Sequence, residues 1–277
     1  MNKLSRSWQL AKSSAAVVAD NKQLLVLPVI SGIAGALVIA TFVIPAVSSG
    51  VLDAEADRQT IAYVWMFLLY VALYFVGIFF NTALVSIVLE RLDGRQASLR
   101  DGLRIAFSRI GAIAGYAVIA ATVGVLLRAI EERVGLIGRL VTAVIGTAWS
   151  VATFLVAPIL AVESVGAVQA VRDSATLLKQ TWGENIAGNV GIAFVFGLAY
   201  LLLIVATVVG VVALANLDFA TLAIAVAIAA CFVGVGLAVG QATLQGVYSA
   251  LLYRYARSGE VPVGFDRGAL DNAFRRK

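Results

Sequence analysis

The chain has 277 residues, of which 61% are hydrophobic and only 13% are charged. Its mean hydropathy is +0.95, whereas a soluble domain carries charge on about a quarter of its residues. This composition excludes an ordinary soluble protein and indicates an integral membrane protein. The sequence contains no histidine and a single cysteine, Cys231, so most metal sites and catalytic triads are excluded as well. We therefore expect no metal, no cofactor and no enzymatic activity.

Six apolar stretches are long enough to cross a hydrocarbon core, which takes about 20 helical residues. They predict an all-α, polytopic fold in which residues 1–253 form a single six-span membrane domain and residues 254–277 form a basic tail. The predicted spans are residues 24–47, 61–89, 110–127, 140–162, 186–214 and 219–253.

The positive charges are distributed unevenly between the two sides of these spans. Seventeen of the 21 lysines and arginines lie before the first span, after the second, fourth and sixth spans, or in the tail, and four lie on the other side. Because cytoplasmic loops retain positive charge, both termini are expected in the cytoplasm. The net charge of +5 then reflects topology and attraction to anionic lipid rather than nucleic-acid binding.

A polar segment precedes each odd-numbered span, and its apolar residues recur at i, i+4, i+7 and i+11. This spacing predicts an amphipathic helix, which we expect to lie in the cytoplasmic interface. The apolar stripes contain Leu4 and Trp8 before the first span, Leu99 and Leu103 before the third, and Val171, Leu178 and Trp182 before the fifth.

The three polar segments also align with one another. Ser7, Gly102 and Ser174 fall at equivalent positions, at offsets of 95 and 72 residues. The alignment suggests three repeated units, each an interfacial helix followed by a transmembrane hairpin. Chance similarity between three segments that flank membrane spans is the alternative.

The strongest polar candidates inside the spans are amides, because no full charge lies mid-span. Four of them fall in the cytoplasmic halves of their spans: Asn81, Asn189, Gln241 and Gln245. They either line a cavity that opens to the cytoplasm or join helices through hydrogen bonds, which contribute about 0.6 kcal/mol each in membranes. We favour the second interpretation.

The connection between the third and fourth spans runs from Arg128 to Arg139. The spacing of Ile130, Val134 and Ile137 predicts a short helix on the outer membrane surface. Glu131 and Glu132 are consecutive and face different directions on a helix. They make a poor catalytic pair, and we expect them to form a solvated face.

The connection between the fourth and fifth spans carries a family resemblance. Its sequence Ala170-Val-Arg-Asp-Ser174, continuing to Glu184 and following Pro158, resembles an uncharacterised family of prokaryotic six-span membrane proteins. It is more distantly similar to the membrane domain of bacterial glycerophosphodiester phosphodiesterases. The resemblance implies a prokaryotic inner membrane and supplies no catalytic residues. The soluble phosphodiesterase domain is missing from this sequence, so that activity is not expected.

Two functions fit the sequence. The first is a non-enzymatic protein that organises the membrane or supports a partner through its interfacial helices, with anionic lipid, another protein or a second copy of the chain as the partner. The second is a channel, exporter or permease component that uses the four amides. The location of the charges favours the first.

Overall fold

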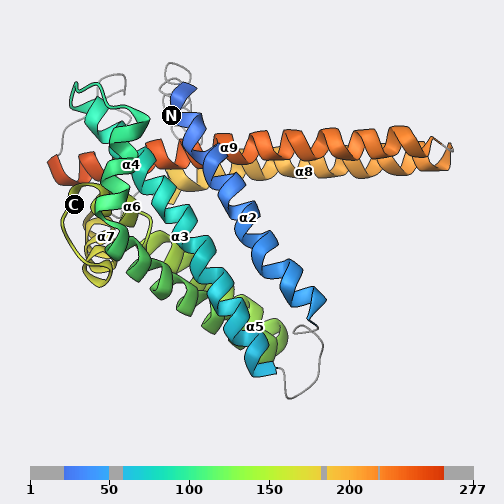
Figure 1. The fold of residues 1–277 in the computed structure, drawn as a ribbon, viewed down its shortest axis with the longest axis horizontal. Coiled ribbons are helices and arrows are strands. Elements are labelled where there is room, and N and C mark those ends of the chain that lie inside the picture. Colours follow the sequence, from blue (N-terminus) through green and yellow to red (C-terminus); the bar gives the residue numbers. More distant parts are fainter. Residues whose placement is uncertain (1–21, 50–58, 182–185, 218, 259–277) are drawn as a thin grey trace. The chain divides into compact units, whose positions relative to one another are not determined.

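The computed structural model describes residues 22–49, 59–181, 186–217 and 219–258. These residues form a short 3-10 turn, Lys22–Leu25, and eight α-helices, and no β-strand occurs among them (Figure 1). The all-α fold class is thereby confirmed for the described residues. The helices are α2 (Val26–Ser48), α3 (Gln59–Leu92), α4 (Leu99–Ser108), α5 (Ile110–Ala152), α6 (Val156–Val162), α7 (Ala167–Thr181), α8 (Ile186–Asn216) and α9 (Ala220–Ser258).

Among the described residues, six helical segments are long and apolar enough to cross a membrane, and each overlaps one of the stretches expected from the sequence. The chain is thus built as a multi-pass membrane protein. The segments are Gln23–Ser48, Thr60–Leu92, Ile110–Glu132, Gly138–Val162, Val195–Asn216 and Ala220–Ser258.

Helix α5 contains parts of two of these segments, because the chain reverses its direction at Gly135. The backbone of Gly135 has φ 63° and ψ −136°, a left-handed conformation that glycine adopts without a steric penalty. The helical segment that ends at Glu132 and the one that begins at Gly138 are therefore joined by a tight turn. The separate surface helix expected between them is not formed, because the first segment simply continues to the turn.

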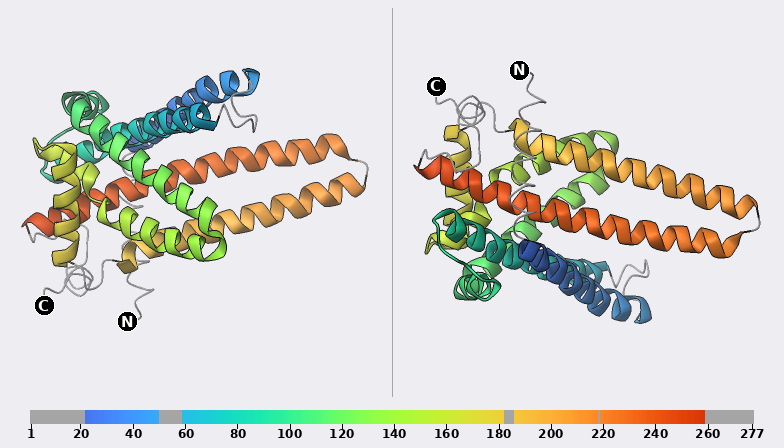
Figure 2. Two further views of the ribbon diagram at one scale, coloured as in Figure 1. Left: turned by 90° about the horizontal axis from the view of Figure 1, so that it is seen from below. Right: turned by 90° about the horizontal axis from the view of Figure 1, so that it is seen from above.

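The chain divides into two compact units. In the first unit, α8 and the larger part of α9 form an antiparallel hairpin (Figure 2). A Cβ atom built on Gly210 of α8 would lie 3.7 Å from a methyl group of Val226 on α9, and one built on Gly234 would lie 3.7 Å from Leu203. Glycines thus allow close contact at two levels of the hairpin. The described residues of this unit are 22–25, 181, 186–217 and 219–248.

The second unit is built around α3, which contacts α2, α4, α5 and α6. Its described helices are α2 to α7 and the last turns of α9, and its described residues are 26–49, 59–180 and 249–258. The Trp65 indole of α3 donates a hydrogen bond to the Phe42 carbonyl oxygen of α2 at 2.9 Å. The rings of the two residues lie 5.3 Å apart. The paired rings and the hydrogen bond fix α2 against α3.

Burial in the second unit is concentrated where α3 and α6 end. Every residue in 82–89 of α3 and in 155–161 at α6 is buried. Elsewhere, large apolar side chains of α2 face outward; Leu37 and Ile44 are 64% and 67% exposed. Soluble proteins rarely expose such continuous apolar surface, whereas lipid solvates it well. The buried region therefore marks the part of this unit that is held by protein contacts.

Candidate functional site

Helix α4 docks on α3 through a glycine. Gly102 and Ala106 are buried, and a Cβ atom built on Gly102 would lie 2.6 Å from the Ala83 carbonyl oxygen and 2.6 Å from Cγ1 of Ile87. Real Cβ atoms essentially never come so close to other heavy atoms. The backbone of α4 thus rests directly on α3 at a position that admits only glycine.

Helix α7 docks through a serine. The Ser174 side chain is completely buried; its hydroxyl donates to the Ala152 carbonyl oxygen at 2.6 Å and accepts from the Leu155 amide at 3.1 Å. These two backbone groups lie where α5 ends and α6 begins, and helix ends leave such groups without a partner in the helix. Ser174 satisfies both and joins α7 to the break between the two helices.

The two docking contacts are equivalent. Gly102 and Ser174 are 72 residues apart, and so are the residues that they contact, Ala83 and Leu155. In each case the docking residue lies 19 positions after its partner. The buried residues 155–161 also map onto the buried residues 83–89 at the same offset. This correspondence supports the repeat for two of the three expected units; the polar segment of the first unit lies outside the described residues.

The predicted apolar stripes supply only part of the docking line, a name that we give to the buried residues of α4 and α7: Gly102, Ala106, Ala170, Ser174 and Leu178. Leu99, Leu103 and Val171 are half-buried, and Leu178 is buried. Leu4, Trp8 and Trp182 lie outside the described residues. The docking line consists mainly of small residues, whereas the predicted stripes consist mainly of large apolar ones. The signal in the sequence was the small residue shared by the aligned segments. The position of these helices in a membrane interface stays a prediction.

A capping box starts helix α4. The Ser98 hydroxyl accepts from the Asp101 amide, and the Asp101 carboxylate accepts from the Ser98 amide at 3.1 Å and from its hydroxyl at 2.7 Å. These hydrogen bonds favour the charged form and lower the pKa of Asp101 below its ordinary value of 3.8. The capping box therefore orders the first turn of α4, the helix that docks on α3 through Gly102.

We expect the contribution of this box to depend on pH. The pKa of Asp101 is lower in the folded chain, so its stabilising effect is fully present above the unfolded value of 3.8 and is lost as the pH falls through the folded value. Asp101→Asn should therefore lower the melting temperature near neutral pH, and the difference from the wild type should shrink in acid. Thermal unfolding in detergent measures it; an equal difference at both pH values would contradict the assignment.

The last turns of α9 are tied to the ends of α3 and α6. Arg254 lies 2.8 Å from an oxygen of Asp93, just after α3. Glu163, just after α6, accepts hydrogen bonds through Oε1 from the Tyr253 hydroxyl at 2.8 Å and from the Arg257 guanidinium. The ends of three even-numbered spans are thus connected on the side where α4 and α7 dock. Because both donors lie on α9 and Glu163 directly follows α6, this carboxylate links the two helices.

The four amides do not form one described cluster. Asn81 is half-buried on α3 in the second unit, whereas Gln241 and Gln245 are half-buried on the part of α9 in the first unit. The side chain of Asn189 lies outside the described residues. Their meeting in a cavity, and the channel or exporter function that depends on it, stay predictions.

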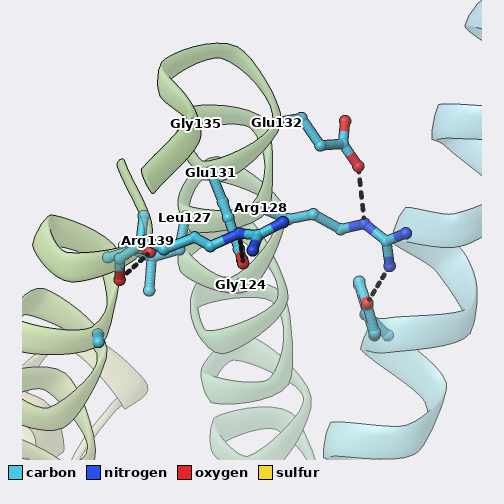
Figure 3. A pocket seen from close by; sticks show the side chains of 10 residues that line it. Gly124, Leu127, Arg128, Glu131, Glu132, Gly135 and Arg139 are labelled. Atoms are coloured by element: carbon cyan, nitrogen blue, oxygen red, sulfur yellow. Dashed lines mark hydrogen bonds and ion pairs between the residues drawn. The ribbon is translucent and has the colours of Figure 1, made fainter. Parts of the chain in front are cut away.

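A pocket of about 790 Å³ lies beside the Gly135 turn, between the two halves of α5 and α3 (Figure 3). Arg128 bridges the pocket: its Nε lies 3.0 Å from Glu132, and its Nη1 donates to the Tyr70 hydroxyl at 3.2 Å. Arg139 and Glu131 form a second ion pair at 3.8 Å. The lining residues are Tyr70, Gly124, Leu127, Arg128, Glu131, Glu132, Gly135, Arg139, Thr142 and Ala143.

Glu131 and Glu132 therefore have a more specific position than the solvated face expected for them. Each pairs with a different arginine, and the side chains of both are about half exposed, at 49% and 47%. Sequence reasoning missed the pocket because Tyr70 reaches it from another helix. Within the described part of the chain, no group of three or more histidine, cysteine, aspartate or glutamate side chains is arranged to hold a metal ion.

A family model described as "Family of unknown function (DUF6159)" matches residues 60–264. The chain belongs to this family. The match spans α3 to α9, so the docking contacts, the link at Glu163 and the pocket all lie within the DUF6159 region. No curated protein and no solved structure matches the chain. Membership of an uncharacterised family is thus confirmed, while the likeness to the phosphodiesterase membrane domain stays a prediction.

Proposed function

We propose that this DUF6159 protein is a non-enzymatic organiser of a prokaryotic plasma membrane that gathers anionic lipid at its cytoplasmic face. Both termini lie in the cytoplasm, as the distribution of lysine and arginine favours. The observation that carries the proposal is the docking of α4 and α7: each is fixed to the buried part of the bundle by a small residue, Gly102 or Ser174. Each helix thereby holds its basic residues in a fixed position.

The exposed surface of these helices suits a lipid head-group region. Arg100 and Arg104 are exposed on α4, as are Arg172 and Lys179 on α7. Exposed apolar side chains lie on the same two helices, with Phe107 at 60% and Val168 at 65% exposed. A basic side chain near an anionic surface contributes about 1 kcal/mol of attraction, and the apolar side chains favour insertion at the acyl boundary. A protein partner with an acidic surface would use the same residues.

The test measures lipid selectivity around the reconstituted full chain. Spin-labelled phosphatidylglycerol and phosphatidylcholine report, by electron spin resonance, how strongly each lipid associates with the protein. The wild type should prefer phosphatidylglycerol, and Arg100→Gln with Arg104→Gln should reduce that preference by about fivefold or more, as the loss of two charges near the surface predicts. The preference should weaken further at high salt.

The matched control removes two arginines that the sequence predicts on the opposite side of the membrane from α4. Arg58→Gln with Arg133→Gln changes the net charge equally and should leave the phosphatidylglycerol preference close to that of the wild type. Equal loss in both double variants would show that net charge alone sets the preference, and no loss in either would reject α4 as a lipid-binding helix. Either result would overturn the proposed function.

A further inference from the structure

We infer that the pocket beside the Gly135 turn of α5 binds the head group of a zwitterionic phospholipid, in which a phosphate and an ammonium group lie close together. This site is separate from the docked helices α4 and α7. Its lining residues come from α3 and from both halves of α5. Its volume of about 790 Å³ lies within the usual range for ligand sites, about 300–1,000 Å³.

The charges of the pocket match a ligand that has no net charge. Two arginines and two glutamates line it, so the charges of the lining sum to zero. The guanidinium of Arg128 or Arg139 offers donors in the planar arrangement that phosphate oxygens accept. Glu131 and Glu132 offer carboxylates to an ammonium group. A purely anionic or purely cationic ligand would leave one pair of side chains facing a like charge.

The pocket also changes from polar to apolar along α5. Gly124 and Ala143 lie four residues further from the Gly135 turn than Arg128 and Arg139 do, which is about one helical turn or 6 Å. Leu127 lines the same wall. The charged side chains thus lie nearer the Gly135 turn, and the small residues Gly124 and Ala143 lie further from it along the two helical segments. An amphiphile suits such a wall better than a ligand that is polar throughout.

The depth of the pocket agrees with a lipid ligand. Arg128 lies four residues before the end of the membrane-crossing segment Ile110–Glu132, about 6 Å inside that end along the helix axis. Charged side chains at this depth reach toward the head-group region. The Tyr70 hydroxyl, which accepts from Arg128 at 3.2 Å, holds that guanidinium toward α3. A phospholipid beside α3 and α5 therefore places its head group at the level of these ion pairs.

The experiment uses the purified full chain in detergent and three probes: dihexanoylphosphatidylethanolamine, dihexanoylphosphatidylglycerol and free phosphoethanolamine. Isothermal titration calorimetry gives the three dissociation constants. The ethanolamine lipid should bind at least about tenfold more tightly than the glycerol lipid and than free phosphoethanolamine. Equal binding of the two lipids would overturn the zwitterion assignment. Equal binding of lipid and free phosphoethanolamine would overturn the lipid assignment and identify a soluble ligand with the same head group.

Charge reversal separates the pocket from general effects. Arg139→Glu makes the lining negative and should weaken binding of the ethanolamine lipid by about tenfold. Adding Glu131→Arg restores both the ion pair and the charge balance and should restore binding. The variant Arg100→Gln with Arg104→Gln should bind the ethanolamine lipid as the wild type does. Unchanged binding in Arg139→Glu, or failure of the double reversal to restore binding at a wild-type melting temperature, would reject the pocket as the site.

Discussion

Replacing Gly102 by valine should release α4 from α3 and destabilise the folded chain by about 3 kcal/mol, the upper part of the range for overpacked positions. The reason is geometric, since the new Cβ atom would meet the Ala83 carbonyl oxygen and the Ile87 side chain at 2.6 Å. A backbone oxygen cannot move aside as the end of a flexible side chain can. Thermal unfolding of the purified protein in detergent, followed by tryptophan fluorescence, measures the loss.

Gly111→Val is the matched control for this experiment. Gly111 also lies in a helix, but a Cβ atom built there has no heavy atom within 4 Å. Both substitutions add the same side chain and carry the same helix propensity. Similar losses of stability in the two variants would show that the tight contact between α4 and α3 is not formed.

Removing the hydroxyl of Ser174 should have the second largest effect. Ser174→Ala leaves the half-buried Ala152 carbonyl and the buried Leu155 amide without this partner, and an unsatisfied buried polar group costs about 1–3 kcal/mol. The free energy of unfolding should fall by a similar amount, with α7 more accessible to hydrogen exchange. The chain offers a close comparison two residues away.

That comparison is Thr176→Val. Thr176 is exposed, and its hydroxyl donates within its own helix to the Arg172 carbonyl oxygen at 2.8 Å. Because water can replace this hydroxyl, its removal leaves no buried group without a partner. Removal of this hydroxyl should change stability by less than about 0.5 kcal/mol, as for most surface substitutions. If Thr176→Val proves as damaging as Ser174→Ala, the hydroxyl of Ser174 has no special role in docking α7.

The six long helices could be predicted from the local sequence, because the length and apolar composition of a stretch are enough to identify a membrane-crossing helix. The six long helical segments overlap the six predicted stretches. The reversal at Gly135 was harder to predict, because glycine is common in membrane helices. Only its positive φ distinguishes it from neighbours that continue a helix.

Contacts between distant residues could not be read from periodicity. The hydrogen bond from Tyr253 to Glu163 joins residues 90 positions apart, and the one from Arg128 to Tyr70 joins residues 58 positions apart. Neither partner has a local signature. The docking line could be predicted in part, since the alignment of the repeated segments placed Gly102 and Ser174 at equivalent positions. The predicted stripes nevertheless consisted mainly of large apolar residues, although close helix packing favours small ones.

The separation of 19 residues between each docking residue and its contact has a consequence for biosynthesis. A ribosome adds about 5–20 residues per second, so the next hairpin takes seconds to appear, whereas short loops close in well under a microsecond. Helix α4 can therefore settle on α3 before α5 is complete, and α7 can settle on α6 before α8 is made. Each newly inserted pair of helices thus gains a contact with the short helix that follows it in the sequence. The protein can therefore assemble in the order in which it is synthesised.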